Sequence, residues 1–407
     1  MANLAALLAA VAALVSVAAG QAAAPDSSTE AARSRMVGAI NSFSVDLYKK
    51  AGSATEGNVV LSPLSAGLLL ALTWMGAGGL TARELGRALH LPQDERVVAL
   101  GSKALVSSLQ TSLKPSQEVI LRFANKLYVQ SGFRLKEDFR LKASSFFAAD
   151  AEQLDFARDA DGARSAINRW VEQYTADKIK DLFPRGSPSS SSLLILVNAV
   201  YLKAIWLHTF DVKQTEMKEF HLSPKSTVKV PTMRKYHDFL FANMADLKAT
   251  ALQLPVEDGR GLKMVIVLPN SVDGLSQLEA NLHLLDVNAI AWEKRSVNIS
   301  LPRFLIEATH NLNVQLQQLG VNDLFTRNAN LSGIANEGLF VSKAVQKTFI
   351  DVNENGIEAA AATGIDFVYF SIPPPRAEFH ADHPFLFFIV KEEVLLFLGR
   401  VTNPQQK

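Results

Sequence analysis

The sequence contains no cysteine among its 407 residues. This absence excludes disulfide bonds, cysteine nucleophiles and thiolate zinc sites, so a large buried core must supply the stability of the chain. An excess of one charge is also missing, because 41 basic residues are balanced by 40 acidic ones. Such a chain has no general attraction for nucleic acid or for an anionic membrane, and we expect neither as a partner.

Motifs of common enzyme chemistry are missing as well. The chain has no G-x-S-x-G, H-E-x-x-H or phosphate-loop pattern, and its eight histidines are scattered. A Ser-His-Asp triad is defined by geometry rather than by spacing, so a hydrolase stays open as a minor hypothesis. We expect a protein with no catalytic residues and no cofactor.

Two polar clusters have a functional and a plain interpretation. The segment "EFHADH" places His380 and His383 close to two acids, but zinc needs three or four converging ligands, so a polar turn before a buried strand is favoured. The segment Phe133–Lys142 carries four basic residues that a sulfated polysaccharide could bind. Glu137 and Asp138 interrupt this cluster, and a solvated helix face is the better interpretation.

Long apolar runs are absent after the N-terminus. Residues 1–20 are apolar, uncharged and end in small residues, which predicts a secretory signal peptide, followed by a flexible segment over 21–33. The run has no Lys or Arg before it, so a retained membrane anchor is the alternative. The remaining residues, 34–407, contain no linker or repeat and are expected to form one domain of a secreted, extracellular monomer.

Two glycosylation triplets agree with export. They begin at Asn298 and Asn330 and have the pattern Asn-x-Ser. Because Asn298 lies in a strand-like run, Asn330 is the better candidate for a glycan.

The periodicity of apolar residues predicts an α+β fold. Helical spacing dominates the first half, as in "DGARSAINRWVEQYTADKIKDLF", whereas apolar strand patterns such as "GLKMVIVLP" and "VLLFLGRV" dominate the second. This distribution indicates large sheets covered by helices.

The segment "NENGIEAAAATG" has an alternation that a buried strand requires. Counting by twos from Ile357 gives only uncharged side chains, and the middle ones are small. These residues are Ile357, Ala359, Ala361, Thr363, Ile365 and Phe367. The acids Glu358 and Asp366 fall on the other face, so one face can enter a sheet. An alanine-rich surface helix is the alternative, because alanine is the best helix former.

Several long motifs together resemble the serpins. They are "NVVLSPLSAGLLLALTWMGAGGLTARELGRAL", "INRWVEQYTADKIKDLF", "LVNAVYLKAIWLHTF", "LGVNDLFTRNANLSGI", "VSKAVQKTFIDVNENGIEAAAAT", "HADHPFLFFIV" and "FLGRVTNP". The resemblance implies three β-sheets, about nine helices and an exposed reactive-centre loop at about 354–383. Inhibitory serpins are suicide substrates, in which the cleaved loop enters the central sheet and traps the protease as a covalent acyl complex. A non-inhibitory carrier, storage or chaperone protein is the alternative.

The resemblance also assigns roles to residues of the loop. Gly356 matches the hinge glycine, and the family's count from it places the cleaved bond between Phe370 and Ser371. The hinge residues after it are Ile357, Glu358, Ala359, Ala360, Ala361, Ala362 and Thr363. Pro373–Pro375 cannot join a sheet interior, so the cut must precede them, which disfavours Arg376.

The residues around this bond predict a protease class. Phe370 suits a deep apolar primary pocket, which is typical of chymotrypsin-like proteases, and Tyr369 gives the same class if the register slips by one. The neighbouring subsite residues are Val368, Tyr369 and Ile372. An elastase-like target is predicted only if the cleaved bond lies two residues away, after Val368 or Ile372.

Four residues match the part of the family fold that opens during insertion. Ser62 and Asn198 match a polar cluster beneath the central strands, and Trp206 matches the tryptophan where insertion starts. Gln346 replaces the usual histidine of that cluster, which predicts a network that does not titrate. Ile357 replaces the common threonine or serine, and its greater bulk is expected to slow insertion.

Overall fold

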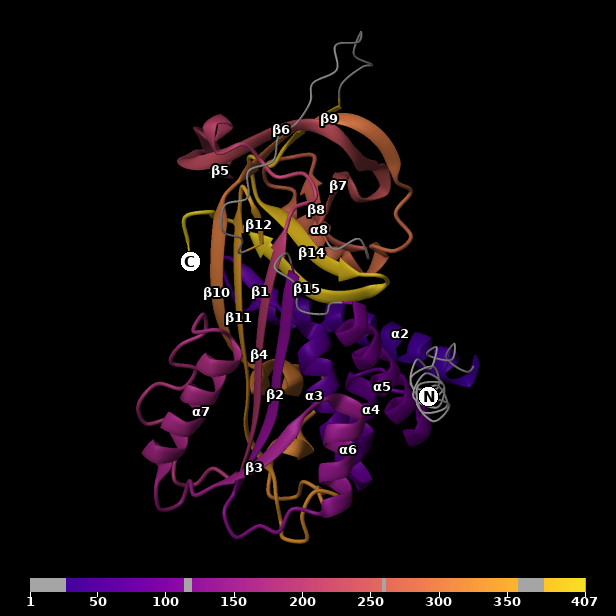
Figure 1. Ribbon diagram of the computed structural model, residues 1–407, viewed down its shortest axis with the longest axis vertical. Coiled ribbons are helices and arrows are strands. Elements are labelled where there is room, and N and C mark those ends of the chain that lie inside the picture. The colour runs from indigo at the N-terminus through magenta and orange to yellow at the C-terminus, as the bar shows by residue number, and fades with distance from the viewer. Residues whose placement is uncertain (1–26, 113–118, 258–260, 358–376, 407) are drawn as a thin grey trace, which may run out of the picture.

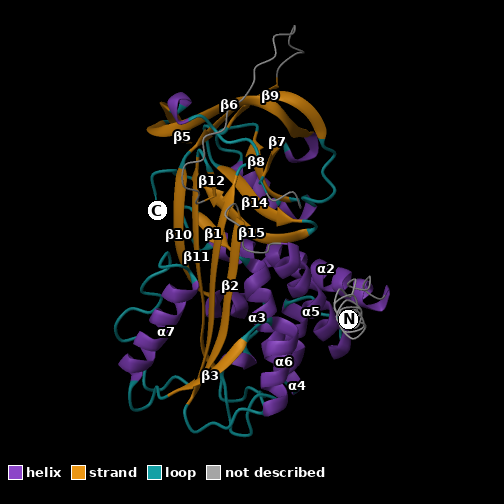
Figure 2. Cartoon of the chain, in the orientation of Figure 1, coloured by secondary structure: helices purple, strands orange, loops and turns teal. Residues whose placement is uncertain are grey.

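The computed structural model describes residues 27–112, 119–257, 261–357 and 377–406. Two large sheets dominate the molecule, and most helices gather around one end of it (Figures 1 and 2). Helices α2 to α6 lie on one side of the long central strands, and α7 lies alone on the other side (Figure 1). The α+β prediction is therefore correct.

The helices begin where the sequence offers suitable first-turn residues. Pro63 opens α3, where its missing N–H is not needed, and the Asp159 side chain accepts a hydrogen bond from the Gly162 amide at the start of α7. The eight α-helices in the described ranges are α2 (Ser27–Ser53), α3 (Pro63–Met75), α4 (Gly79–Ala88), α5 (Glu95–Ser112), α6 (Glu137–Phe147), α7 (Ala160–Tyr174), α8 (Leu275–Ala280) and α9 (Leu312–Gln318). Helix α2 begins at Ser27, so the last part of the 21–33 segment is helical rather than flexible.

The central sheet has six strands in the order β10-β11-β12-β4-β2-β3. They are β2 (Val119–Gln130), β3 (Asp150–Leu154), β4 (Leu194–Ile205), β10 (Phe304–Asn311), β11 (Val341–Asn353) and β12 (Gly356–Ile357). Strands β4 and β11 run parallel to each other and pair directly, from Val341 opposite Leu194 to Phe349 opposite Tyr201. Helices cover both faces, which explains why β4 reads as a nearly unbroken apolar run.

The second sheet has nine strands. They are β1 (Val59–Leu61), β5 (Glu216–Ser223), β6 (Ser226–Met244), β7 (Ala249–Pro255), β8 (Leu262–Pro269), β9 (Glu293–Pro302), β13 (Ala377–His380), β14 (Phe385–Lys391) and β15 (Val394–Val401). Strand β6 pairs with β5 and β9 along most of its length and with β7 at its end. It thereby joins these strands into one sheet, so the described residues form two sheets where the family resemblance implies three.

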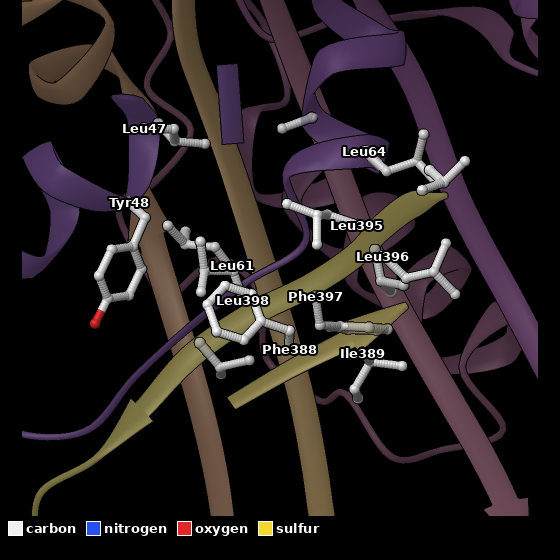
Figure 3. Packing of buried hydrophobic residues seen from close by; sticks show 14 of the residues in the cluster. Leu47, Tyr48, Leu61, Leu64, Phe388, Ile389, Leu395, Leu396, Phe397 and Leu398 are labelled. Atoms are coloured by element: carbon white, nitrogen blue, oxygen red, sulfur yellow. The ribbon is translucent and has the colours of Figure 1, made fainter. Parts of the chain in front are cut away.

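The main core lies where α2 and α3 pack on β14 and β15 (Figure 3). Phe388, Phe397 and Leu398 are almost fully buried there. Tyr48 donates a hydrogen bond to Glu279 Oε1 at 2.6 Å, and Arg400 Nη1 donates to the same oxygen at 2.8 Å. Burial raises the pKa of Tyr48 well above its ordinary value, and the Glu279 carboxylate adds to this shift, so the phenol stays a neutral donor.

Phe388→Ala should lower the free energy of unfolding by about 3–5 kcal/mol, because it leaves a cavity in this core. Urea denaturation followed by circular dichroism measures the effect. Leu141→Ala is the control, since Leu141 is 55% exposed and its loss should change stability by less than about 0.5 kcal/mol. Similar losses for both variants would contradict the assignment of the core.

Candidate functional site

The beginning of the predicted loop already occupies the central sheet. Strand β12 lies between β11 and β4 and is antiparallel to both, with Gly356 opposite Asn353 and Ile205. Gly356 has φ +156°, and a Cβ placed there would come within 2.0 Å of the Ala204 carbonyl oxygen. Only glycine fits this close approach, which gives a physical reason for the hinge residue.

Ile357 is completely buried in this position. It lies opposite Val352 on β11 and Ala204 on β4, and all three belong to the main core. The structure therefore places the branched side chain in the sheet before any cleavage. Its bulk is accommodated in this state, and the expectation that Ile357 slows insertion stays a prediction.

The turn between β11 and β12 is fixed by two side chains. Trp206 Nε1 donates to the Asn353 carbonyl at 2.9 Å, and the Trp206 amide donates to the Asn355 carbonyl at 2.9 Å. Glu354 is 4% exposed, accepts a hydrogen bond from Thr215 Oγ1 at 2.7 Å and lies 3.6 Å from Arg303 Nε. The role of Glu354 was not predicted, because its partners are distant in the sequence.

Ser62, Asn198 and Gln346 meet in one buried network where β4 and β11 pair. The Ser62 amide donates to Gln346 Oε1 at 2.9 Å, and Gln346 Nε2 donates to the Ser62 carbonyl at 2.8 Å. Gln346 Nε2 also donates to Asn198 Oδ1 at 2.5 Å. Because Gln346 lies opposite Asn198 in the β11–β4 register, this bond bridges the two neighbouring strands.

Two further residues extend the network to β2 and α3. Asn198 Nδ2 donates to Asn125 Oδ1 and to Ser65 Oγ, and Ser65 Oγ donates to Asn125 Oδ1 at 2.9 Å. Neither Ser65 nor Asn125 was predicted from the sequence. Ser65 lies in a mostly apolar run, where a buried polar residue is a signal that could have found it, whereas Asn125 is flanked by Arg122 and Lys126 and gives no such signal.

A titratable group lies beside this network after all. His310 on β10 is directly opposite Gln346, and its Nε2 donates to the Val60 carbonyl at 2.9 Å. Burial lowers the pKa of His310 below its ordinary 6.5, although the bond to Val60 opposes the shift. His310 is therefore a titratable group on the strand next to Gln346, and it bonds Val60 rather than a member of the network.

The two glycosylation triplets lie in different surroundings. Asn330 is exposed in a loop, and its Oδ1 accepts a hydrogen bond from Ser332 Oγ at 2.8 Å. Asn298 lies on β9, as predicted, and its Nδ2 donates to Glu378 Oε2 at 2.8 Å.

The "EFHADH" histidines have local partners. His380 Nε2 lies 3.0 Å from Glu378, and His383 bonds both Asp382 and the Pro269 carbonyl at 2.8 Å. Within the described ranges, no three His, Asp or Glu side chains gather closely enough to hold a metal ion. None of the helices described is long and apolar enough to cross a membrane.

The remaining predicted positions lie outside the described residues. They are the signal segment 1–20 and the loop residues Glu358, Ala359, Ala360, Ala361, Ala362, Thr363, Ile365, Asp366, Phe367, Val368, Tyr369, Phe370, Ser371, Ile372, Pro373, Pro374, Pro375 and Arg376.

A family model described as "Serpin (serine protease inhibitor)" matches residues 38–404. The chain belongs to the serpin family. It is 38% identical to Iris of Ixodes ricinus and 37% identical to the leukocyte elastase inhibitor of Bos taurus, in each case over 89% of this chain and 97% of the relative. The crystal structure of Serpin48 of Tenebrio molitor has a TM-score of 0.82 and 36% identity, covering 91% of this chain and 98% of that one. As a serpin, the protein belongs to a family of protease inhibitors and not of catalysts.

The stability of this serpin should depend on pH through His310. Its pKa is lowered in the folded state, so its contribution is complete above about pH 6.5 and is lost as the pH falls below that value. The loss is at most about 1.4 kcal/mol per pH unit. His310→Gln should flatten the dependence between about pH 6.5 and 5 in urea titrations. His283→Gln, at an exposed position, is the control, and equal slopes for both variants would sink the idea.

Proposed function

We propose that this serpin is a secreted suicide-substrate inhibitor of chymotrypsin-like serine proteases. The observation that carries the proposal is the position of Gly356 and Ile357, which already pair with β11 and β4 as the first residues of an inserted strand. Further insertion would add the residues after Ile357 to this strand, between β4 and β11. Parallel pairs are slightly weaker than antiparallel ones, and insertion replaces one parallel pair by two antiparallel pairs.

The register of β12 predicts where each later residue would lie. If it continues residue by residue, Thr363 arrives opposite both Asn198 and Gln346. These are the two residues whose side-chain bond closes the sheet. A threonine hydroxyl both donates and accepts, so Thr363 can replace the bond that its own insertion breaks.

The same register supports the predicted buried face. Ile357 faces the main core, so residues of its parity face it too. Ala361 would lie between Val200 and Thr348, both fully buried, where an alanine fits and a larger or charged residue does not. The small residues of the segment are therefore explained by the strand that receives them.

The two ends of the loop are held in different sheets. Gly356 belongs to the central sheet, whereas β13 begins at Ala377 and pairs with β9 in the other sheet. An intact loop cannot fill the central sheet while its far end is fixed in this way. Cleavage between Phe370 and Ser371 frees the N-terminal part, and the residues from Gly356 to Phe370 span about 50 Å as a strand.

The chemistry of trapping uses the protease's own intermediate. The attacking serine of the protease forms an ester with the Phe370 carbonyl, and the amine of Ser371 leaves. Water would normally hydrolyse this ester. If insertion is faster, Phe370 moves to the opposite end of the sheet with the protease attached, and the covalent complex persists.

The side chains at the bond set the target class in this proposal. Phe370 occupies the apolar primary pocket of a chymotrypsin-like protease, and Val368, Tyr369 and Ile372 contact neighbouring subsites. An elastase-like target requires the bond to shift toward Val368 or Ile372. We also propose that the 1–20 segment is removed on export. The exposed Asn330 is the proposed site of a glycan.

Mixing the purified protein with chymotrypsin should give a complex that survives a denaturing gel. Phe370→Arg should make trypsin rather than chymotrypsin form the complex, because the primary pocket of the protease binds the side chain at this position. Elastase serves as the third protease and tests the shifted bond. Complete cleavage by all three without any complex would instead support a non-inhibitory carrier, storage or chaperone serpin.

Ala361→Glu should convert the inhibitor into a substrate, because a carboxylate would have to be buried between β4 and β11. Ala360→Glu is the matched control, since it falls on the parity that already carries Glu358 and should keep most of the inhibition. The ratio of complex to cleaved serpin on a denaturing gel measures both. Equal ratios for the two variants would refute the register.

A further inference from the structure

Lys343 is a half-buried lysine near the start of β11, at the end of the central sheet away from Gly356. Its Nζ donates a hydrogen bond to Ser187 Oγ at 2.6 Å and lies 5.7 Å from the centre of the Phe183 ring. Within the described ranges, no carboxylate forms an ion pair with it. An ammonium group has three donors, so the bond to Ser187 leaves donors and a positive charge for an anion.

Two other lysines of the central sheet have acidic partners. Lys347, four residues after Lys343 on β11, is 7% exposed and lies 2.7 Å from Glu307 Oε1. Lys126 on β2 is also 7% exposed and lies 2.7 Å from Glu152 Oε2. Because lysines in this sheet are held by carboxylates where they are buried, the unpaired ammonium of Lys343 requires an explanation.

The register of β12 gives the residue that would arrive beside Lys343. Counted on from Ile357, Asp366 falls opposite Lys343 on β11 and opposite Ile195 on β4. The two counts agree, because Lys343 and Ile195 are partners in the β11–β4 ladder. Directly opposite residues share a face of a sheet, so the Asp366 side chain would lie beside the Lys343 side chain.

The residues between β12 and β13 carry charges that fit this arrangement. Glu358, Asp366 and Arg376 are the charged residues in 358–376, and both acids precede the proposed cleaved bond. In the same register, Glu358 falls opposite Lys203 and Asp351, so attraction by one is opposed by repulsion from the other. Asp366 meets a cation and a neutral side chain, so its net interaction is attractive.

We propose that Lys343 binds the Asp366 carboxylate once the cleaved loop has entered the central sheet. This inference rests on the proposed function. Phe183 and Ile195 are buried beside the pair, so solvent ions screen it less than a pair on the open surface. Asp366 comes nine residues after Ile357, so the contact forms late in insertion. Lys343 is thus a positioning residue that holds the last part of the inserted strand.

Exchanging the two charges tests the pair. Scanning calorimetry, in urea at one fixed concentration, compares the intact protein with the cleaved protein purified from the chymotrypsin reaction. Lys343→Glu and Asp366→Lys should each lower the melting temperature of the cleaved form by about 3 °C relative to the intact form, because like charges then face each other. The double variant restores opposite charges and should recover most of this loss.

Two neutral variants give a matched control. Asp366→Asn should lower the melting temperature of the cleaved form by about 2 °C, and Glu358→Gln by less than about 0.5 °C, because only Asp366 has a net attraction to lose. Equal losses in these two variants would contradict the assignment of the pair.

The wild type separates failure of the pair from failure of the proposed function. If the cleaved wild type melts above the intact protein, as insertion requires, additive losses in the charge-exchange double variant overturn the pair alone. A cleaved wild type that melts no higher than the intact protein, with no covalent complex from any of the three proteases, overturns the proposed function and the pair with it.

Discussion

The pairing of β4 with β11 is the constraint on which the rest of this serpin depends. In the proposed mechanism, the two strands stay together in the intact protein and part when a new strand enters. A parallel ladder with a side-chain bridge from Gln346 to Asn198 suits both demands. The bridge is buried and well bonded, so it holds the sheet closed, but it consists of neutral groups that another neutral group can replace.

The contacts around this pair divide into those that start insertion and those that resist it. At one end, Gly356 and Ile357 are already in place, and Trp206 and Glu354 fix the turn that precedes them. Further down, the polar network ties β4 to α3 and β2. If the proposed insertion takes place, its first pairs are therefore already formed, and the network is the next group of contacts that must open.

The sequence predicted the sheet-rich second half and three members of the network, because these depend on local periodicity or on long family motifs. The insertable parity stays a prediction, since only its first residue, Ile357, lies in the described part of the chain. Ser65, Asn125 and His310 were missed, since their importance arises only when strands distant in the chain become neighbours. The helical start at Ser27 was misjudged because polar N-terminal residues resemble a flexible segment, whereas packing of the later turns of α2 stabilises them.

The close approach of Gly356 to the Ala204 carbonyl has a consequence for how the loop can evolve. Because only glycine fits there, Gly356 sets the register in which the residues after it would pair with β4. Side chains of a strand alternate between faces, so under the proposed insertion one residue added or removed before Thr363 would reverse the faces of the residues that follow it and shift the hydroxyl away from the network. Under the same proposal, residues near the cleaved bond could change and alter the target protease, whereas the number of residues between Gly356 and Thr363 could not change.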